Sequence, residues 1–265
     1  MQIHPTALVS KNAELADDVV VGPYAVIEDK VRLGAGVKVG PHAVIYPHTS
    51  VASGCSIHAH AVIGDLPQDL AYKDSVSYVR IGPGTTIREG VTIHRGTKPE
   101  TVTEVGQSCY LMANSHLAHN VKLGNSVVIA NGALLAGYVE VGERVFISGN
   151  CVIHQFVRIG RMAMLGGNSG ISQDVLPFCT AASVRLNVTA GLNVVGLRRA
   201  GISAADRLVV KRIFMTIFRS GLNMSQAAEK VRREIQSPYA TEMCEFIESS
   251  KRGICGFKSG QEDED

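Results

Sequence analysis

The sequence predicts a parallel β-helix built from hexapeptide repeats, followed by a small helical domain, in a chain of 265 residues. Three observations support this fold class. An aliphatic residue recurs at every sixth position, a small residue often stands two positions before it, and the repeat is lost after Ile171. A period of six fits neither an amphipathic helix nor an alternating strand, but it is typical of a solenoid in which three hexapeptides make one coil.

The repeat covers most of the chain. Ile, Val or Leu occupies 26 of the 29 positions spaced six apart between Ile3 and Ile171, and only Asp69, Ser75 and Pro99 interrupt the series. Residues two apart share one face of a strand, so the aliphatic residue and the small residue before it both point inward. The small residues are Ala7, Ala13, Ala25, Ala43, Cys55, Ala61, Cys109, Ser115, Ala133, Cys151, Ala163 and Ser169. Each coil covers its neighbour, so the solenoid buries a continuous core.

We expect the β-helix to span residues 1–190, with two interruptions. The segments 65–80 and 95–104 carry proline and charged residues where the inward pair should stand. Both are therefore predicted to be loops expelled from the wall of the β-helix. Insertions into solenoids map to loops, and such loops often bind ligands.

Helical signals begin after the repeat, and we expect a helical C-terminal domain over residues 191–257. Ser203 predicts the N-terminus of a first helix, Ser225 that of a second, and Ser237-Pro238 that of a third. Serine accepts hydrogen bonds from the free N–H groups of a first turn, and proline fits the first helical position.

Composition and charge exclude several classes of function. The net charge of +2 and the pI of about 8.2 are too mild to indicate a nucleic-acid-binding protein. The N-terminal residues do not resemble a signal peptide and no run of 18 apolar residues occurs, so we expect a cytoplasmic protein without stable membrane insertion. Of the six scattered cysteines, Cys55, Cys109 and Cys151 hold the inward small-residue position and are expected to be buried small side chains, and the tail 258–265 is expected to be disordered.

Four of the nine histidines fall in one stretch of the repeat: His94, His116, His119 and His154. Neither His116 nor His119 holds an inward position. His119 and His154 are 35 residues apart, close to two full coils, so they should lie along one edge of the prism. One such histidine would be read as an ordinary surface residue, but the group indicates a site.

The segments around these histidines carry a resemblance to a known family. They read TIHRG (92–96), NSHLAHN (114–120), LLAGYVEVG (134–142), VIHQFVRIG (152–160) and GGNSGISQDV (166–175). Together with Gln68-Asp69-Leu70 and the later Asn193 to Arg199, they resemble the UDP-N-acetylglucosamine 3-O-acyltransferases that begin lipid A biosynthesis, and the resemblance spans essentially the whole chain.

The resemblance implies a left-handed β-helix, against the usual right-handed rule for parallel crossovers, and a homotrimer with active sites between adjacent prisms. It implies an enzyme that moves a 3-hydroxyacyl chain from acyl carrier protein to the 3-hydroxyl of UDP-N-acetylglucosamine, with no metal and no other cofactor. For the acidic carrier protein we expect a basic landing surface in the helical domain. The basic residues of that stretch are Arg198, Arg199, Arg207, Lys211, Arg212 and Arg219.

The resemblance also implies roles for single residues. His119 matches the general base, and the backbone N–H of Gly137 matches the oxyanion donor. A sugar hydroxyl must lose its proton as it attacks a thioester, and an imidazole can take that proton; a glycine allows the thioester to approach the main chain closely. The matching substrate-binding residues are Gln68, Asp69, His94, His116, His154, Gln155, Gly167, Asn193 and Arg199.

Among these, Gln68 and Asp69 match loop residues that hold the sugar nucleotide, and Asn193 and Arg199 match residues at its nucleotide end, where a guanidinium suits a diphosphate. Gly167 matches the position that limits the length of the acyl chain, because a missing side chain leaves the groove open.

Five residues depart from the family's pattern. Ala71, Asn120, Tyr138, Val195 and Ala200 stand where Lys, Asp, His, an acidic residue and Arg are usual. Most of these positions concern recognition of the nucleotide sugar, so a related acyltransferase with another acceptor, such as a 3-amino sugar nucleotide, remains an alternative.

Two alternatives come from other classes of protein. One is a β-helical zinc enzyme that uses His116, His119 and His154, because a catalytic zinc needs three protein ligands and an open position. The other is a scaffold without catalytic activity. The clustered histidines and the two expelled loops argue against it.

Overall fold

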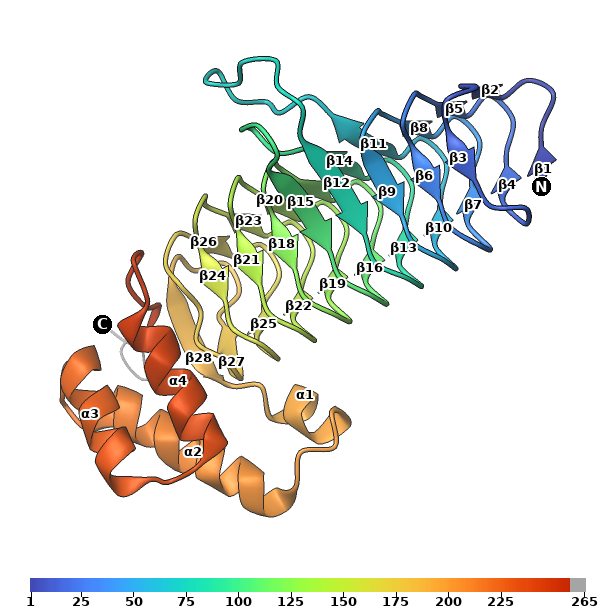
Figure 1. Ribbon diagram of the computed structural model, residues 1–265. Helices are drawn as coiled ribbons and strands as arrows, with labels where there is room; N and C mark the ends of the chain where they lie inside the picture. Colours follow the sequence, from blue (N-terminus) through green and yellow to red (C-terminus); the bar gives the residue numbers. More distant parts are fainter. Residues whose placement is uncertain (258–265) are drawn as a thin grey trace.

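The computed structural model describes residues 1–257 and shows a three-sided β-helix with helices gathered at its C-terminal end (Figure 1). The expected left-handed parallel β-helix is confirmed. Three sheets form the walls of the prism, and within the described residues they contain 12, 9 and 8 strands. The tail expected to be disordered, 258–265, lies outside the described residues.

Each sheet collects one strand from successive coils, and sheet A is extended by β28, which is antiparallel to β27, and by β29. Sheet A contains β1 (Gln2–Ile3), β4 (Val20–Val21), β7 (Lys38–Val39), β10 (Ser56–Ile57), β13 (Thr86–Ile87), β16 (Tyr110–Leu111), β19 (Val128–Ile129), β22 (Phe146–Ile147), β25 (Met164–Leu165), β27 (Cys179–Ala181), β28 (Val188–Leu192) and β29 (Gly256–Phe257). Sheet B contains β2 (Leu8–Val9), β5 (Val26–Ile27), β8 (Val44–Ile45), β11 (Val62–Asp65), β14 (Thr92–His94), β17 (His116–Leu117), β20 (Leu134–Leu135), β23 (Val152–Ile153) and β26 (Gly170–Ile171). Sheet C contains β3 (Glu14–Leu15), β6 (Arg32–Leu33), β9 (Thr49–Val51), β12 (Tyr78–Ile81), β15 (Val102–Val105), β18 (Lys122–Leu123), β21 (Glu140–Val141) and β24 (Arg158–Ile159).

The aliphatic residues of the repeat stack in rows inside the prism. In sheet B, Leu117 pairs with Leu135 and Leu135 with Ile153, and all three side chains are fully buried. Burial of such a side chain stabilises the fold by roughly 1.5–3 kcal/mol. Ile3 is 41% exposed, because no coil covers the N-terminal end of the stack. All six cysteines are free and buried, among them Cys55, Cys109 and Cys151, for which burial was expected.

Both expelled loops exist, but they are shorter than the segments 65–80 and 95–104. The first leaves the wall after β11 and returns at β12, and the second lies between β14 and β15. Residues 78–80 and 102–104 belong instead to paired strands of sheet C. The reason is that Val79 and Thr103 are fully buried in the inward position, despite the polar residues around them.

The helical domain contains α1 (Val194–Arg199), α2 (Ala204–Arg219), α3 (Met224–Glu234) and α4 (Pro238–Glu248). Ser203 caps α2 and Ser237 caps α4, with Pro238 at its first turn, as predicted. The prediction that Ser225 caps α3 is wrong. Asn223 caps this helix and forms a reciprocal capping box with Gln226, which leaves Ser225 inside the first turn.

The short helix α1 was not expected from the sequence pattern, and the sheet reaches further than expected. Strand β28 continues to Leu192, past the expected domain boundary at residue 190, and β29 returns from the C-terminal end to pair with it. Among the described residues, no helix is long and apolar enough to cross a membrane.

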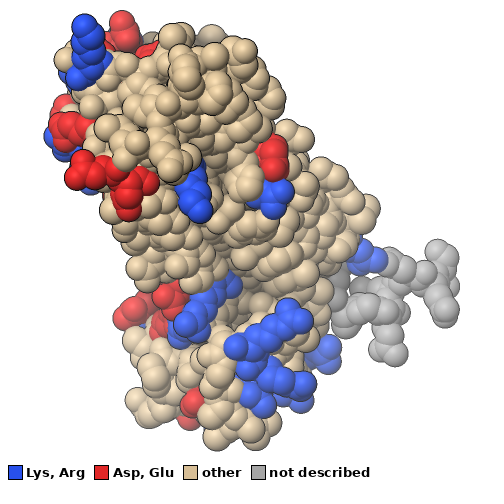
Figure 2. Space-filling view, turned by 90° about the vertical axis from the view of Figure 1, so that its right-hand side faces the viewer, with Lys and Arg blue, Asp and Glu red and all other residues tan. Residues whose placement is uncertain are grey.

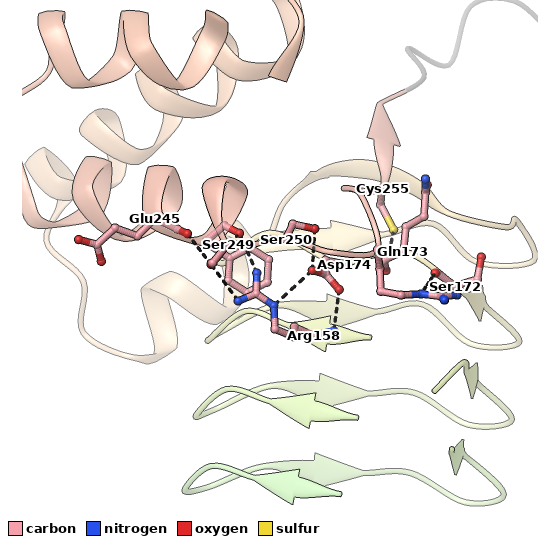
Figure 3. A network of polar contacts seen from close by, with 10 residues as sticks. Arg158, Ser172, Gln173, Asp174, Glu245, Ser249, Ser250 and Cys255 are labelled. Atoms are coloured by element: carbon pink, nitrogen blue, oxygen red, sulfur yellow. Dashed lines mark hydrogen bonds and ion pairs between the residues drawn. The ribbon is translucent and has the colours of Figure 1, made fainter. Parts of the chain in front are cut away.

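An ion pair between Arg158 and the buried Asp174, at the end of the β-helix, is linked by hydrogen bonds to the end of α4 and the segment that follows it (Figure 3). Nε of Arg158 lies 3.3 Å from Oδ2 of Asp174, which is 1% exposed, and Ser250 donates a hydrogen bond of 2.8 Å to the same oxygen. The guanidinium also donates to Oγ of Ser249 and to the carbonyl of Phe246. Removing one partner of a buried ion pair typically costs about 3–5 kcal/mol, so this network fixes the C-terminal segment against the β-helix.

Candidate active site

A cleft of about 480 Å³ lies on sheet B, beside the bends that lead to sheet C. It brings together residues of four neighbouring coils and of the first expelled loop. Seven of the eleven expected site residues line it: Gln68, Asp69, His94, His116, His119, Gly137 and Gln155. The first expelled loop supplies one wall of the cleft through Gln68, Asp69 and Leu70.

His119, Gly137 and Gln155 follow one another at intervals of 18 residues, so they occupy the same bend in successive coils. The imidazole of His119 is packed over Gly137, and the residue is 8% exposed. A Cβ atom at position 137 would overlap Cε1 and Nε2 of the ring and stand 3.0 Å from Nδ1. Glycine is therefore required for the ring to lie over this bend. No group within residues 1–257 accepts a hydrogen bond from the Gly137 N–H.

The hydrogen-bond partner of His119 determines which ring nitrogen carries the proton. Nδ1 lies 3.1 Å from Oδ1 of Asn120, and the same atom lies 3.0 Å from the backbone nitrogen of Thr97. Because a backbone N–H can only donate, the atom that it meets is the amide oxygen of Asn120. Nδ1 of His119 must then donate as well, so the neutral ring has its lone pair on Nε2.

Nε2 of His119 faces the carboxylate of Asp69, with 3.6 Å between Nε2 and Oδ2. The loop fixes this orientation, because the other carboxylate oxygen accepts a hydrogen bond of 2.9 Å from the N–H of Ala71. Asp69 therefore places a negative charge beside the nitrogen that can take a proton. Asn120 cannot supply such a charge.

His94 and His116 form the deep end of the cleft. Their rings meet edge to face with centroids 4.8 Å apart. Burial lowers the pKa of His94, and burial together with the neighbouring His94 and His119 lowers the pKa of His116 to about 4. Both rings are therefore uncharged at neutral pH. Nδ1 of His94 is buried and has no hydrogen-bond partner among the described residues, so a polar group of a ligand would satisfy it.

His154 lies exposed, outside the residues that line the cleft. Nδ1 of His154 is 3.0 Å from a guanidinium nitrogen of Arg252, 98 residues away in the chain. The same nitrogen lies 3.2 Å from the carbonyl oxygen of Gln155, so it has both a donor and an acceptor within hydrogen-bond distance. Nothing in the repeat pattern pointed to Arg252, which reaches the site only because the segment after α4 is bound to the last coil.

The remaining three expected residues are also outside the cleft of a single chain. Gly167 lies in the bend between sheets A and B, at the opposite border of sheet B from His119. Asn193 and Arg199 lie at the two ends of α1. The Asn193 amide caps that helix and donates a hydrogen bond of 2.8 Å to the carbonyl of Met162, and Arg199 is exposed.

Two apolar residues of the site were not singled out from the sequence. Leu134 and Val152 line the cleft, and they pair in adjacent coils with side chains that are 43% and 54% exposed. An outward position of a hexapeptide is expected to be polar. Two aliphatic residues at such positions could therefore have indicated, from the sequence alone, an apolar surface for a ligand or a partner.

The histidines considered as zinc ligands do not converge. His116 and His119 line the cleft, whereas His154 lies apart and binds Arg252 through Nδ1. In the part of the chain that the structure describes, no group of three or more His, Cys, Asp or Glu side chains is placed to hold a metal ion.

Two family models match parts of the chain. Residues 174–255 match a model described as domain 2 of UDP-N-acetylglucosamine O-acyltransferase. Residues 30–65 and 103–137 match the model of the bacterial transferase hexapeptide.

Curated relatives match nearly the full length. The chain is 51% identical to the acyl-[acyl-carrier-protein]–UDP-N-acetylglucosamine O-acyltransferase of Trichlorobacter lovleyi, over 96% of this chain and 99% of the relative. It is 44% identical to the enzyme of the same name from Thermodesulfovibrio yellowstonii, again over 96% and 99%.

Solved structures agree with these relatives. The UDP-N-acetylglucosamine acyltransferase of Francisella novicida superposes with a TM-score of 0.93 at 31% identity, over 98% of this chain and 95% of that chain. The enzyme of Campylobacter jejuni superposes with a TM-score of 0.90 at 37% identity, over 97% and 100%.

Proposed function

The chain belongs to the UDP-N-acetylglucosamine O-acyltransferase family, and we propose that it transfers a 3-hydroxyacyl chain from acyl carrier protein to the 3-hydroxyl of UDP-N-acetylglucosamine, the first step of lipid A biosynthesis. One observation carries the chemistry. A single cleft contains the His119 imidazole, whose Nδ1 is engaged by Asn120, packed against Gly137, whose N–H has no acceptor among the described residues.

In the proposed reaction the acceptor hydroxyl gives its proton to Nε2 of His119 while its oxygen attacks the thioester carbonyl. The oxyanion that forms accepts a hydrogen bond from the Gly137 N–H. Collapse of this intermediate breaks the carbon–sulfur bond, and the departing thiolate takes the proton back from the imidazolium. The Asp69 carboxylate, 3.6 Å from Nε2, favours the positive charge that His119 carries between these two steps.

The acyl chain needs an apolar path away from this centre. Leu134 and Val152 supply exposed aliphatic surface on sheet B, between the bend of His119 and the bend of Gly167. We propose that the chain lies across these two residues and ends near Gly167. Burial of each methylene on such a surface contributes about 0.8 kcal/mol, so the groove can select for chain length.

We propose that the enzyme is a homotrimer. The outward side chains of sheet C alternate in charge along Glu104, Lys122, Glu140 and Arg158, a pattern suited to water. Outward positions of sheet A are apolar along Val128, Phe146 and Met164, and sheet B exposes the aliphatic pair described above. Two apolar faces and one charged face suit a prism packed against two neighbours. Light scattering at micromolar concentration should give three times the mass of the chain, and a monomer would contradict the proposal.

The donor protein would dock on the helical domain. Figure 2 shows Lys and Arg side chains gathered on the part of the surface below the β-helix, where the helices lie, while the β-helix above carries both basic and acidic side chains. Arg207 and Lys211 of α2 also border an apolar groove of about 550 Å³ that contains Leu208. A basic rim around apolar surface is suited to an acidic carrier protein.

A cytoplasmic location is part of the same proposal. It is supported by the six free and buried cysteines, because reduced thiols are typical of that compartment.

The experiment that tests the function is a product analysis with two enzymes. Purified protein is incubated with UDP-N-acetylglucosamine and a panel of acyl carrier protein thioesters, and products are identified by mass spectrometry. The wild type should form the 3-O-acyl sugar nucleotide, and His119→Ala should lose at least about 99% of the rate, the lower limit of general-base contributions. His60→Ala, an exposed histidine on another bend, is the matched control. A product formed only from a 3-amino acceptor would contradict the proposed substrate.

A further inference from the structure

We propose that the hydroxyls of Thr97 and Tyr138 hold the Asn120 side-chain amide in the one orientation that keeps His119 active as a base. This inference rests on the proposed function, in which Nε2 of His119 takes the acceptor's proton. It concerns two residues, Thr97 and Tyr138, that do not touch the reacting atoms and act through Asn120.

Asn120 differs from an aspartate in a way that matters at this position. A carboxylate has two equivalent oxygens, so it accepts the Nδ1–H of a histidine whichever way it is turned. A carboxamide has one acceptor and one donor end. If the amide were turned over, its NH₂ would meet Nδ1, and the imidazole hydrogen would then reside on Nε2. In that tautomer Nε2 already carries a hydrogen, so it cannot take the proton of the sugar hydroxyl.

Thr97 specifies the productive orientation with two donors. Its backbone N–H lies 3.0 Å and its hydroxyl 3.1 Å from Oδ1 of Asn120. Turning the amide over would break both hydrogen bonds and bring the NH₂ group against the N–H of Thr97. A buried donor without a partner is unfavourable, and Asn120 is 6% exposed.

Tyr138 completes the chain of hydrogen bonds. Its hydroxyl lies 2.9 Å from Oγ1 of Thr97. The single hydroxyl proton of Thr97 is directed to Asn120, so Tyr138 must donate to Thr97. Tyr138 therefore donates to Thr97, and both Thr97 and His119 donate to Asn120. The backbone N–H of Thr97 fixes these directions, because it can only donate to Oδ1 of Asn120.

Neighbouring residues hold Tyr138 and Thr97, the first two members of this hydrogen-bond series, in place. The ring of Tyr138 stacks on Phe156 with centroids 4.9 Å apart and meets the ring of His119 edge-on at 5.2 Å. Thr97 lies in the second expelled loop, and that loop is anchored by the fully buried Ser77, whose hydroxyl donates a hydrogen bond of 2.6 Å to the carbonyl of Gly96. The second loop thus contributes to the site without lining the cleft.

The decisive variants remove one hydroxyl each. Thr97→Val keeps the shape and the backbone N–H, and Tyr138→Phe keeps the stacked ring. We expect each to lower kcat about tenfold, on the scale of one lost hydrogen bond, with KM for both substrates and the thermal midpoint unchanged. Thr97→Ser, which retains the hydroxyl, should keep wild-type kcat. Tyr78→Phe is the matched control, because its hydroxyl bonds Glu100 beside the same loop but lies outside this chain of hydrogen bonds.

Two further measurements separate orientation of the amide from simple support of the fold. Nitrogen-15 NMR of the His119 ring should show the Nδ1–H tautomer in the wild type and a rising fraction of the Nε2–H tautomer in Thr97→Val. Asn120→Asp introduced into Thr97→Val should restore kcat, because a carboxylate needs no orientation. The double variant of Thr97→Val and Tyr138→Phe should be no slower than Thr97→Val alone.

The inference is overturned if both single variants retain wild-type kcat, if their loss appears in KM or thermal stability with an unchanged ring tautomer, or if Asn120→Asp restores nothing. These outcomes are distinct from a failure of the proposed function. That failure would appear as high residual activity in His119→Ala, whatever the Thr97 and Tyr138 variants do.

Discussion

Nε2 of His119 lies 3.6 Å from Oδ2 of Asp69, and these two residues come from a bend of the β-helix and from the loop expelled from its wall. The contact answers a question that the sequence raised. Asn120, which follows the base, is neutral, so the charge that stabilises an imidazolium has to come from elsewhere. Asp69 supplies it from the opposite side of the ring.

Asp69→Asn should therefore lower kcat about tenfold, because it removes the charge that favours the imidazolium and keeps the size of the side chain. Steady-state kinetics measure the effect. Asp74→Asn, in the same loop and exposed, is the matched control and should behave as wild type. Equal activities of the two variants would show that the Asp69 charge plays no part in the reaction.

Gly137→Ala should reduce the rate at least about 100-fold, since its Cβ would displace the His119 ring and obstruct the oxyanion donor. The thermal midpoint should change little, because the ring can move toward the open cleft. Gly191→Ala is the control, as its Cβ would have no neighbour within 4 Å. Near-normal turnover in Gly137→Ala would rule out this donor.

Gly167→Met should shorten the preferred acyl chain. A Cβ at this position would stand 3.6 Å from the carbonyl oxygen of Gly149, an ordinary contact, so a side chain can start here without moving the backbone. Each excluded methylene forfeits about 0.8 kcal/mol, or about fourfold in kcat/KM. The measurement is the rate with donors of increasing chain length, and an unchanged profile would show that the groove ends elsewhere.

Reversing Lys211 and Arg212 to Glu should raise KM for the carrier-bound donor about tenfold and leave KM for the sugar nucleotide unchanged. Both residues are exposed on α2. The effect should shrink with added salt, since charges are screened over about 10 Å at 0.1 M. Arg232→Glu, on α3, is the control. Equal changes for both substrates would place the docking surface elsewhere.

Stability should fall as the pH drops from 6.5 toward 4. The pKa of His116 is about 4 in the folded chain and 6.5 without its burial, and burial lowers the pKa of His94 as well. In this range the unfolded chain binds more protons, so acid favours unfolding and the full stability is present above pH 6.5. The loss due to His116 has an upper limit of about 3 kcal/mol. Denaturant titrations of wild type and His116→Gln should show a shallower loss in the variant, and parallel curves would contradict the assignment.

The sequence by itself determined the β-helix, its core and the position of its interruptions. A hexapeptide determines which residues face inward by local chain geometry alone, so the repeat assigns Leu117, Leu135 and Ile153 to the core, where all three are fully buried. The same regularity made the expelled loops visible as breaks. It could not fix their limits, since Val79 and Thr103 return to the wall through pairing with strands of other coils.

Only the tertiary structure decided how the candidate site is assembled. The period of the repeat places His119 above Gly137, but it contains no information on where an expelled loop folds back. Asp69 meets His119, Thr97 meets Asn120, and Arg252 meets His154 across 98 residues of chain. Each of these contacts joins a residue of the repeat to a segment outside it, and the hexapeptide period cannot predict where such a segment lies. The hydrogen-bond partners of the proposed base therefore follow from the folded chain and from nothing in the repeat.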